Sequence, residues 1–129
     1  MNDLDDLQLA KQSFSYRDII GQDKWETWTV SYSFATATSL TVSGRFRVVG
    51  RQCFFQVKST GTSIATTAGT SYIDLPIAAS GYGGVGTMTN DTTNVAVGVG
   101  HIDVATSRFY PPAQLASGND FIFAGWFEV

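Results

Sequence analysis

The stretch RFRVVGRQCFFQVKSTGTSIATTAGTSYIDLP, residues 45–76, decides the fold class of this chain. It opens with two strand-like runs that meet at Gly50, and a glycine supplies the positive φ that the first central position of a type II′ turn requires. A loop of small residues follows, and a short third run stops at Pro76, because proline removes a ladder donor. This order of parts predicts antiparallel β-structure.

Apolar and polar residues alternate on both sides of the predicted turn. In residues 40–49, Val42, Phe46 and Val48 share one face while hydroxyl and arginine side chains share the other. Residues 52–58 alternate in the same way, with Cys53, Phe55 and Val57 facing inward. The two runs therefore predict the half-buried strands of one hairpin.

The β signals continue to the end of the chain. The valines at 95, 97 and 99 differ in parity from Ile102 and Val104, so burial of both sets predicts a bulge near Gly100 and His101. The same patterns predict strands at 25–32, 72–75, 95–99 and 121–129, and loops at 33–39 and 78–93, the second with one short strand near 85–89. We expect an all-β fold, an antiparallel β-sandwich of jelly-roll type, with its C-terminus held in a sheet.

The chain divides into an N-terminal arm, residues 1–24, and a β-sandwich domain, residues 25–129. In the arm, Leu4, Leu7 and Phe14 fall at helical spacing, and aspartates near its start suit the N-terminal end of a helix. An isolated helix of this length is marginal in water, so it needs a partner surface. We expect these three side chains to anchor the arm on a neighbouring protein; the alternative is that the arm folds against its own sandwich.

Composition narrows the function classes. A chain of 129 residues with 43% hydrophobic and 13% aromatic residues is one folded domain rather than a disordered segment. Only 15% of the residues are charged, and 12 Ser and 15 Thr supply the polar surface instead, as in exposed β-rich modules. The net charge of −3 argues against nucleic-acid binding.

The charge is unevenly distributed. Residues 25–58 carry four bases and one acid, a balance of +3, whereas residues 59–129 carry one base and five acids, a balance of −4. This split would let one protomer face the next, with ordinary scatter as the alternative. The N-terminus has neither a basic region nor a long apolar run, so we expect neither a signal peptide nor membrane insertion.

Several residues and motifs match the pattern of a functional site but lack the surrounding residues that such a site needs. A single cysteine, Cys53, excludes an internal disulfide, and its strand-like setting predicts a buried small hydrophobe rather than a nucleophile. Residues 81–86 match G-x-G-x-x-G, but β and turn residues follow where a nucleotide site needs a helix, so we predict a turning loop. His101 and Asp103 share a strand face, yet a metal site needs a third ligand, and the sequence does not place Asp74 or Asp91 beside them.

We therefore expect no metal and no cofactor. The acids Asp74, Asp91, Asp103, Asp120 and Glu128 are scattered over turns and strand ends, and none of them forms the carboxylate pair that glycoside hydrolysis needs. No catalytic residue is expected, and the protein is predicted not to be an enzyme. The candidate binding residues are aromatics in loop-like contexts, Tyr82, Phe109 and Tyr110, because an exposed ring can stack on a sugar or anchor an interface. The alternative is that such rings fold over the edge of the core.

The order F-R-V-V-G, a hydrophobic strand, S-T-G-T, I-D-L-P and a final F-A-G-W-F-E-V resembles the C-terminal β-sandwich modules of bacteriophage tail fibres and minor tail proteins. The resemblance covers about residues 40–129. It implies a non-enzymatic structural protein of the virion, assembled in the host cytoplasm as a homotrimer. Its implied partners are other virion proteins and a host-surface glycan or receptor.

The chain departs from long tail fibres, which carry a shaft before the tip, because only the arm precedes the sandwich here. This favours a small tail-tip or tail-fibre piece that docks through residues 1–24. The alternative is a capsid decoration protein, and a third class is a free lectin-like module or a glycan depolymerase.

Overall fold

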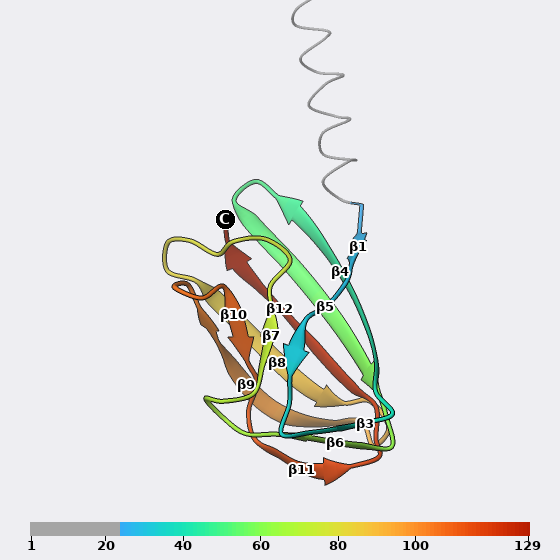
Figure 1. Cartoon of the computed structure of the whole chain (residues 1–129). Helices are drawn as coiled ribbons and strands as arrows, with labels where there is room; N and C mark the ends of the chain where they lie inside the picture. Colours follow the sequence, from blue (N-terminus) through green and yellow to red (C-terminus); the bar gives the residue numbers. More distant parts are fainter. Residues whose placement is uncertain (1–23) are drawn as a thin grey trace, which may run out of the picture.

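The computed structural model describes residues 24–129 (Figure 1). All regular elements in this range are strands, and all their pairings are antiparallel, which confirms the all-β prediction. In chain order the strands are β1 (Glu26–Trp28), β2 (Tyr32–Ser33), β3 (Thr36–Thr38), β4 (Thr41–Val49), β5 (Gln52–Thr60), β6 (Ser63–Thr66), β7 (Tyr72–Asp74), β8 (Gly84–Asn90), β9 (Val95–Asp103), β10 (Arg108–Tyr110), β11 (Gln114–Ser117) and β12 (Phe121–Glu128).

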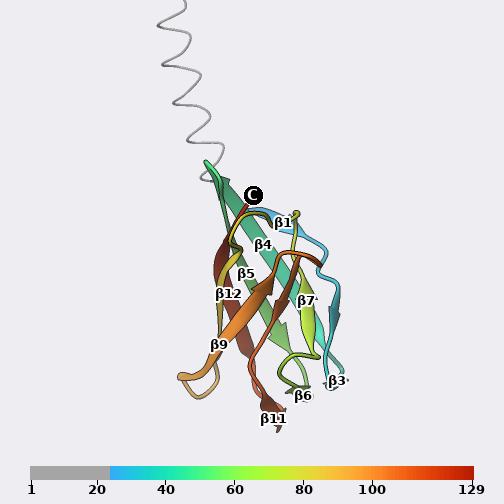
Figure 2. The same cartoon turned by 90° about the vertical axis from the view of Figure 1, so that its left-hand side faces the viewer.

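The larger sheet curls on itself. Its nine strands run in the order β1-β4-β5-β12-β8-β9-β10-β7-β2, so β1 and β2 form its two edges although only residues 29–31 separate them in the chain. A link that short spans at most about 14 Å, so the edges must come close together. Strands β7 and β10 thereby lie across the core from β4 and β5, and the three-stranded sheet β11-β6-β3 covers one end (Figures 1 and 2).

The predicted β4–β5 hairpin is confirmed. Val49 pairs with Gln52 across a two-residue turn, and of the two turn residues only Gly50 has a positive φ, 61°. This is the type II′ geometry expected from the sequence. Strand β5 runs two residues beyond the predicted segment and buries Cys53, Phe55, Val57 and Ser59.

Replacing Gly50 by alanine is expected to lower the free energy of unfolding by about 1 kcal/mol, because a Cβ disfavours this left-handed backbone conformation. Gly50→Asn, which tolerates positive φ better, should cost less than the alanine variant. Equilibrium unfolding in urea measures both changes. Equal stability of Gly50→Ala and the native sequence would contradict the turn assignment.

The core is built mainly from phenylalanine. Phe55, Phe109, Phe121, Phe123 and Phe127 are all fully buried, and they come from β5, β10 and β12. The ring centroids of Phe55 and Phe109 are 5.6 Å apart, and those of Phe109 and Phe123 are 6.3 Å apart. Phe109 thus joins the two sides of the curled sheet.

Glycines make room for this ring. A Cβ built on Gly86 or on Gly100 would lie 2.4 Å from Cε1 of Phe109, so the aromatic ring rests on two residues that have no side chain. The short strand predicted near 85–89 within the 78–93 segment is confirmed, and it extends over residues 84–90. They form β8, a strand between β12 and β9, and its inward glycines serve close packing rather than flexibility.

Near the start of the domain, the observed strands also differ from those predicted from the local sequence pattern. Residues 25–32, predicted as one strand, form β1 and β2 at opposite edges of the sheet, with β1 on β4 and β2 on β7. Residues 33–39, predicted as a loop, contain β3, which pairs with β6 in the smaller sheet. Each pairing joins segments far apart in the chain, which local alternation does not report.

The predicted bulge lies elsewhere along β9. Its register shifts between Met88 and Thr89, which pair with Gly98 and Ala96 and leave Val97 without a counterpart. Val95 and Val99 are 58% and 65% exposed, so the expectation that all three valines are buried is wrong. Val99 lies on the outer face opposite Thr87, whereas Val97 packs against the core, and the bulge adjusts the parity that turns Ile102 inward.

The C-terminal strand is held as expected. β12 lies between β5 and β8, and the amide of Val129 donates to the carbonyl of Arg51 at 2.9 Å. The predicted anchoring residues Leu4, Leu7 and Phe14, like almost all of the 1–24 arm, lie outside the described residues. Among residues 24–129 no helix is long and apolar enough to cross a membrane.

Candidate functional site

One row of side chains crosses the outer face of the larger sheet. Directly paired residues of antiparallel strands point to the same side. The inward side is identified by the burial of Cys53, Phe55 and Phe127, so their sequence neighbours Phe54 and Trp126 point outward. The register continues this row over Arg47, Phe54, Trp126, Val85, His101 and Tyr110, which we call the aromatic row.

Arginine side chains stack at the first end of the aromatic row. The guanidinium carbons of Arg45 and Arg47 lie 4.7 and 5.1 Å from the centroid of the Trp25 ring, and that of Arg47 lies 5.3 Å from Phe54. Such cation–π contacts contribute about 0.5–1 kcal/mol each where they are exposed. They fix the direction of long side chains that would otherwise be mobile.

A second cluster holds the other end of the aromatic row. Tyr110 packs edge-on against Tyr72 with 6.2 Å between ring centroids, and the guanidinium carbon of Arg108 lies 3.8 Å from the centroid of Tyr72. The Nε of Arg108 donates to Oδ1 of Asp74 at 3.0 Å. Hydrogen bonds to Tyr110 and then to Asp74 raise the pKa of Arg108. The predicted candidate Tyr110 is therefore a half-exposed ring in a fixed cluster, on a strand rather than in a loop.

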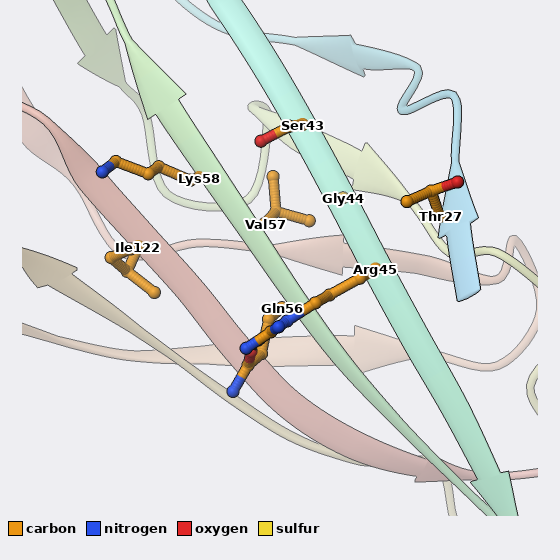
Figure 3. A pocket seen from close by; sticks show the side chains of 8 residues that line it. All are labelled: Thr27, Ser43, Gly44, Arg45, Gln56, Val57, Lys58 and Ile122. Carbon is orange, nitrogen blue, oxygen red and sulfur yellow. The ribbon is translucent and has the colours of Figure 1, made fainter. Parts of the chain in front are cut away.

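A hollow of about 310 Å³ lies beside the aromatic row, over β1, β4, β5 and β12 (Figure 3). It is lined by Thr27, Ser43, Gly44, Arg45, Gln56, Val57, Lys58 and Ile122. Arg45 and Lys58 supply two positive charges, and none of the carboxylates of residues 24–129 lines the hollow. The Nε of Arg45 donates to Oε1 of Gln56 at 2.8 Å, so the guanidinium is held over β5.

The predicted candidate Tyr82 is the most exposed of the large hydrophobic side chains in the described residues, at 99%. It lies between Gly81 and Gly83, both with positive φ, in a turn tied to β12. The backbone amide of Ser80 donates to the carbonyl of Glu128, and the backbone amide of Glu128 donates to the carbonyl of Gly83, each at 2.8 Å. Tyr82 therefore projects from a turn that backbone hydrogen bonds attach to β12, at the end of the sandwich where the C-terminus lies.

The prediction that Phe109 is a binding residue is wrong. Phe109 is fully buried beneath Phe55 and Phe123, so its ring is part of the core and offers no surface for binding. Strand β10 pairs on both sides, with β9 and β7, which leaves its alternate residue, Phe109, pointing inward. The two prolines that follow, Pro111 and Pro112, end the strand and give the segment a loop-like sequence, although Phe109 itself lies within β10.

Within residues 24–129, the structure brings no third ligand to His101 and Asp103. Asp103 accepts a hydrogen bond from the hydroxyl of Thr106, and Asp74 is engaged by Arg108. Asp91 lies in the β8–β9 turn, where its amide donates to the carbonyl of Asp120. Over residues 24–129, no three histidine, cysteine or acidic side chains come together as a metal-binding group.

Sequence reasoning missed both the aromatic row and the hollow. Phe54 and Trp126 each stand next to a buried phenylalanine, and their parity alone indicates that they face outward. Their alignment with one another, and with Arg47, depends on the register of strands that are distant in the chain.

No family model, curated protein or solved structure matches this chain. The candidate site is therefore defined by its own geometry.

Proposed function

We propose that this protein is a non-enzymatic structural protein of a bacteriophage virion, a tail-tip or tail-fibre module that presents its β-sandwich for attachment to the host surface. The observation that carries the proposal is the outer sheet face, where half-exposed aromatic rings, stacked arginines and hydroxyl side chains lie on a hydrogen-bonded sheet. Such a face suits recognition of a surface, because its side chains are held in place before any partner arrives.

The ends of the sandwich give the proposed module a direction. Trp25 stacks on Arg45 and Arg47, so the described chain begins beside the upper part of β4, at the same end as the β4–β5 hairpin and the C-terminus (Figure 1). Residues 1–23 join the sandwich there. If this segment is the anchor, the smaller sheet and the β8–β9 turn project away from the particle, and the outer face with its hollow lies along the flank.

We extend the proposal to a homotrimer. It is supported by the resemblance to tail-fibre modules and by the opposite charge balance of residues 25–58 and 59–129. Sedimentation of the full chain at tens of micromolar should give the mass of three protomers. A monomer at that concentration would contradict this part of the proposal.

The position in the virion is tested by immunogold electron microscopy of purified particles, with antibody raised against the sandwich. Gold is expected at the tail tip. Gold spread over the capsid would instead support the alternative, a decoration protein. Particles without gold would contradict both.

The anchoring role is tested by deleting residues 1–24 in the phage. We expect the truncated protein to keep its β-rich circular dichroism spectrum and its melting transition, and to be missing from particles. Incorporation at the native level would show that the arm is not the anchor.

A further inference from the structure

The hollow beside the aromatic row concentrates positive charge on a protein that is negative as a whole. Arg45 and Lys58 line it, and no carboxylate from the described part of the chain does, whereas the whole chain carries a net charge of −3. A polyanion therefore gains little from the overall charge of the protein, and its attraction would be confined to this place.

The guanidinium of Arg45 is positioned in advance. Stacking on Trp25 at 4.7 Å and the 2.8 Å bond to Gln56 restrain the side chain, and the bond uses only its Nε. The two terminal amino groups are the remaining donors of the guanidinium, in the planar geometry that matches a carboxylate. Because the side chain is already ordered, binding an anion there costs little conformational entropy.

The rest of the lining suits a sugar ring. Thr27 and Ser43 offer exposed hydroxyl groups, Gln56 offers an amide, and Ile122 gives an apolar wall opposite Lys58, its direct partner across β12 and β5. A volume of about 310 Å³ is at the lower end of the range for ligand pockets, as a short saccharide would require.

Two aromatic rings lie next to the hollow, farther along the same strands. Phe54 is two residues from Gln56, about 7 Å along the strand, and Trp126 is directly paired with Phe54, so both rings lie on the same face as the hollow and next to it. Aromatic faces offer a broad apolar contact for the C–H side of a neighbouring sugar. The combination of a cationic hollow and adjoining aromatic rings favours a chain of sugars over a single small anion.

We propose that this hollow binds an acidic polysaccharide, with the carboxylate of one sugar between Arg45 and Lys58 and the next sugar against Phe54 and Trp126. The inference deepens the proposed function, on which it rests, by naming the chemical class of the host-surface partner. Neutral glycans lack the group that the two cations select.

Oligosaccharides of polygalacturonic acid, hyaluronic acid and polysialic acid, together with their carboxyl-reduced counterparts, serve as probes for the full chain in calorimetric titration. We expect at least one acidic probe to bind, and its carboxyl-reduced form to bind at least tenfold more weakly. Lys58→Ala and Arg45→Ala should each weaken binding at least tenfold, and Phe54→Ala should weaken it by a smaller factor. The matched control is Arg51→Ala, which removes a cation from the hairpin turn outside the hollow and should leave binding unchanged.

Any of three titration results would overturn the proposal: no binding of any acidic probe, equal binding of a carboxyl-reduced probe, or an equal loss in the Arg51→Ala control. Lys58 is exposed, so Lys58→Ala is expected to fold, and its melting temperature verifies this. If Lys58→Ala and Arg45→Ala change the sedimentation of the protein and leave probe binding intact, the hollow is an interface between copies and the proposal is wrong.

Failure of this inference is distinguishable from failure of the proposed function. Gold at the tail tip with no saccharide binding removes the inference alone. Saccharide binding without gold on particles removes the virion assignment and supports the site.

Discussion

Replacing Gly86 by alanine is expected to lower the free energy of unfolding by about 3 kcal/mol, the upper part of the range for overpacking a core. The new Cβ would lie 2.4, 2.8 and 3.0 Å from three atoms of the Phe109 ring. That ring is fully buried between Phe55 and Phe123, so it has no free space into which it can move. The clash is with one side chain only, which makes it removable by a second substitution.

In a Phe109→Ala background the same Gly86→Ala change should cost much less. Phe109→Ala alone is expected to cost about 3–5 kcal/mol, as for other buried phenylalanines. Equilibrium unfolding of the four proteins gives the coupling energy between the two positions. We expect the double variant to be more stable than the sum of the single changes by at least about 1 kcal/mol.

Gly100→Ala is the matched control for this cycle. Its Cβ would meet Phe109 at 2.4 Å and also the backbone carbonyl oxygen of Tyr110 at 2.4 Å. Removing the Phe109 ring leaves the backbone clash, so rescue by Phe109→Ala should be smaller than for Gly86→Ala. Additive costs at Gly86 and Phe109 would contradict the packing of the ring on β8.

The second large effect concerns Cys53 at alkaline pH. Burial raises the pKa of the Cys53 thiol from 9.0 to about 12. Between these values the unfolded chain loses a proton that the folded protein keeps, so the free energy of unfolding falls as pH rises. The slope approaches about 1.4 kcal/mol per pH unit, and the stabilisation is complete below pH 9 and lost on rising through the folded pKa.

Comparison with Cys53→Ala isolates this contribution, because the other titrating groups are common to both proteins. The stability difference between the native sequence and Cys53→Ala should shift by about 1.6 kcal/mol between pH 9 and pH 10.5, against the native protein. Urea unfolding at these two pH values and at pH 7.5 measures it. Parallel pH profiles for the two proteins would contradict a buried thiol.

Thiol labelling gives an independent readout of the same burial. Cys53 is inaccessible to solvent in β5, so a thiol reagent should modify it only after unfolding.

The sequence by itself determined the all-β class, the β4–β5 hairpin with its turn at Gly50, the inward face of β5 and the burial of Cys53. These features follow from local chemistry. Side chains alternate along a strand with a period of two, and a glycine marks the positive φ that a tight turn needs.

Tertiary structure alone decided which strands became neighbours. The inward position of Phe109, the place of β8 between β12 and β9, and the outer alignment of Phe54 with Trp126 all depend on pairings between distant segments. The hollow that places Arg45 near Lys58 needs the same pairings, across β1, β4, β5 and β12. Alternation tells which face a residue occupies within its own strand, whereas register, set by the burial of the whole core, decides what stands beside it.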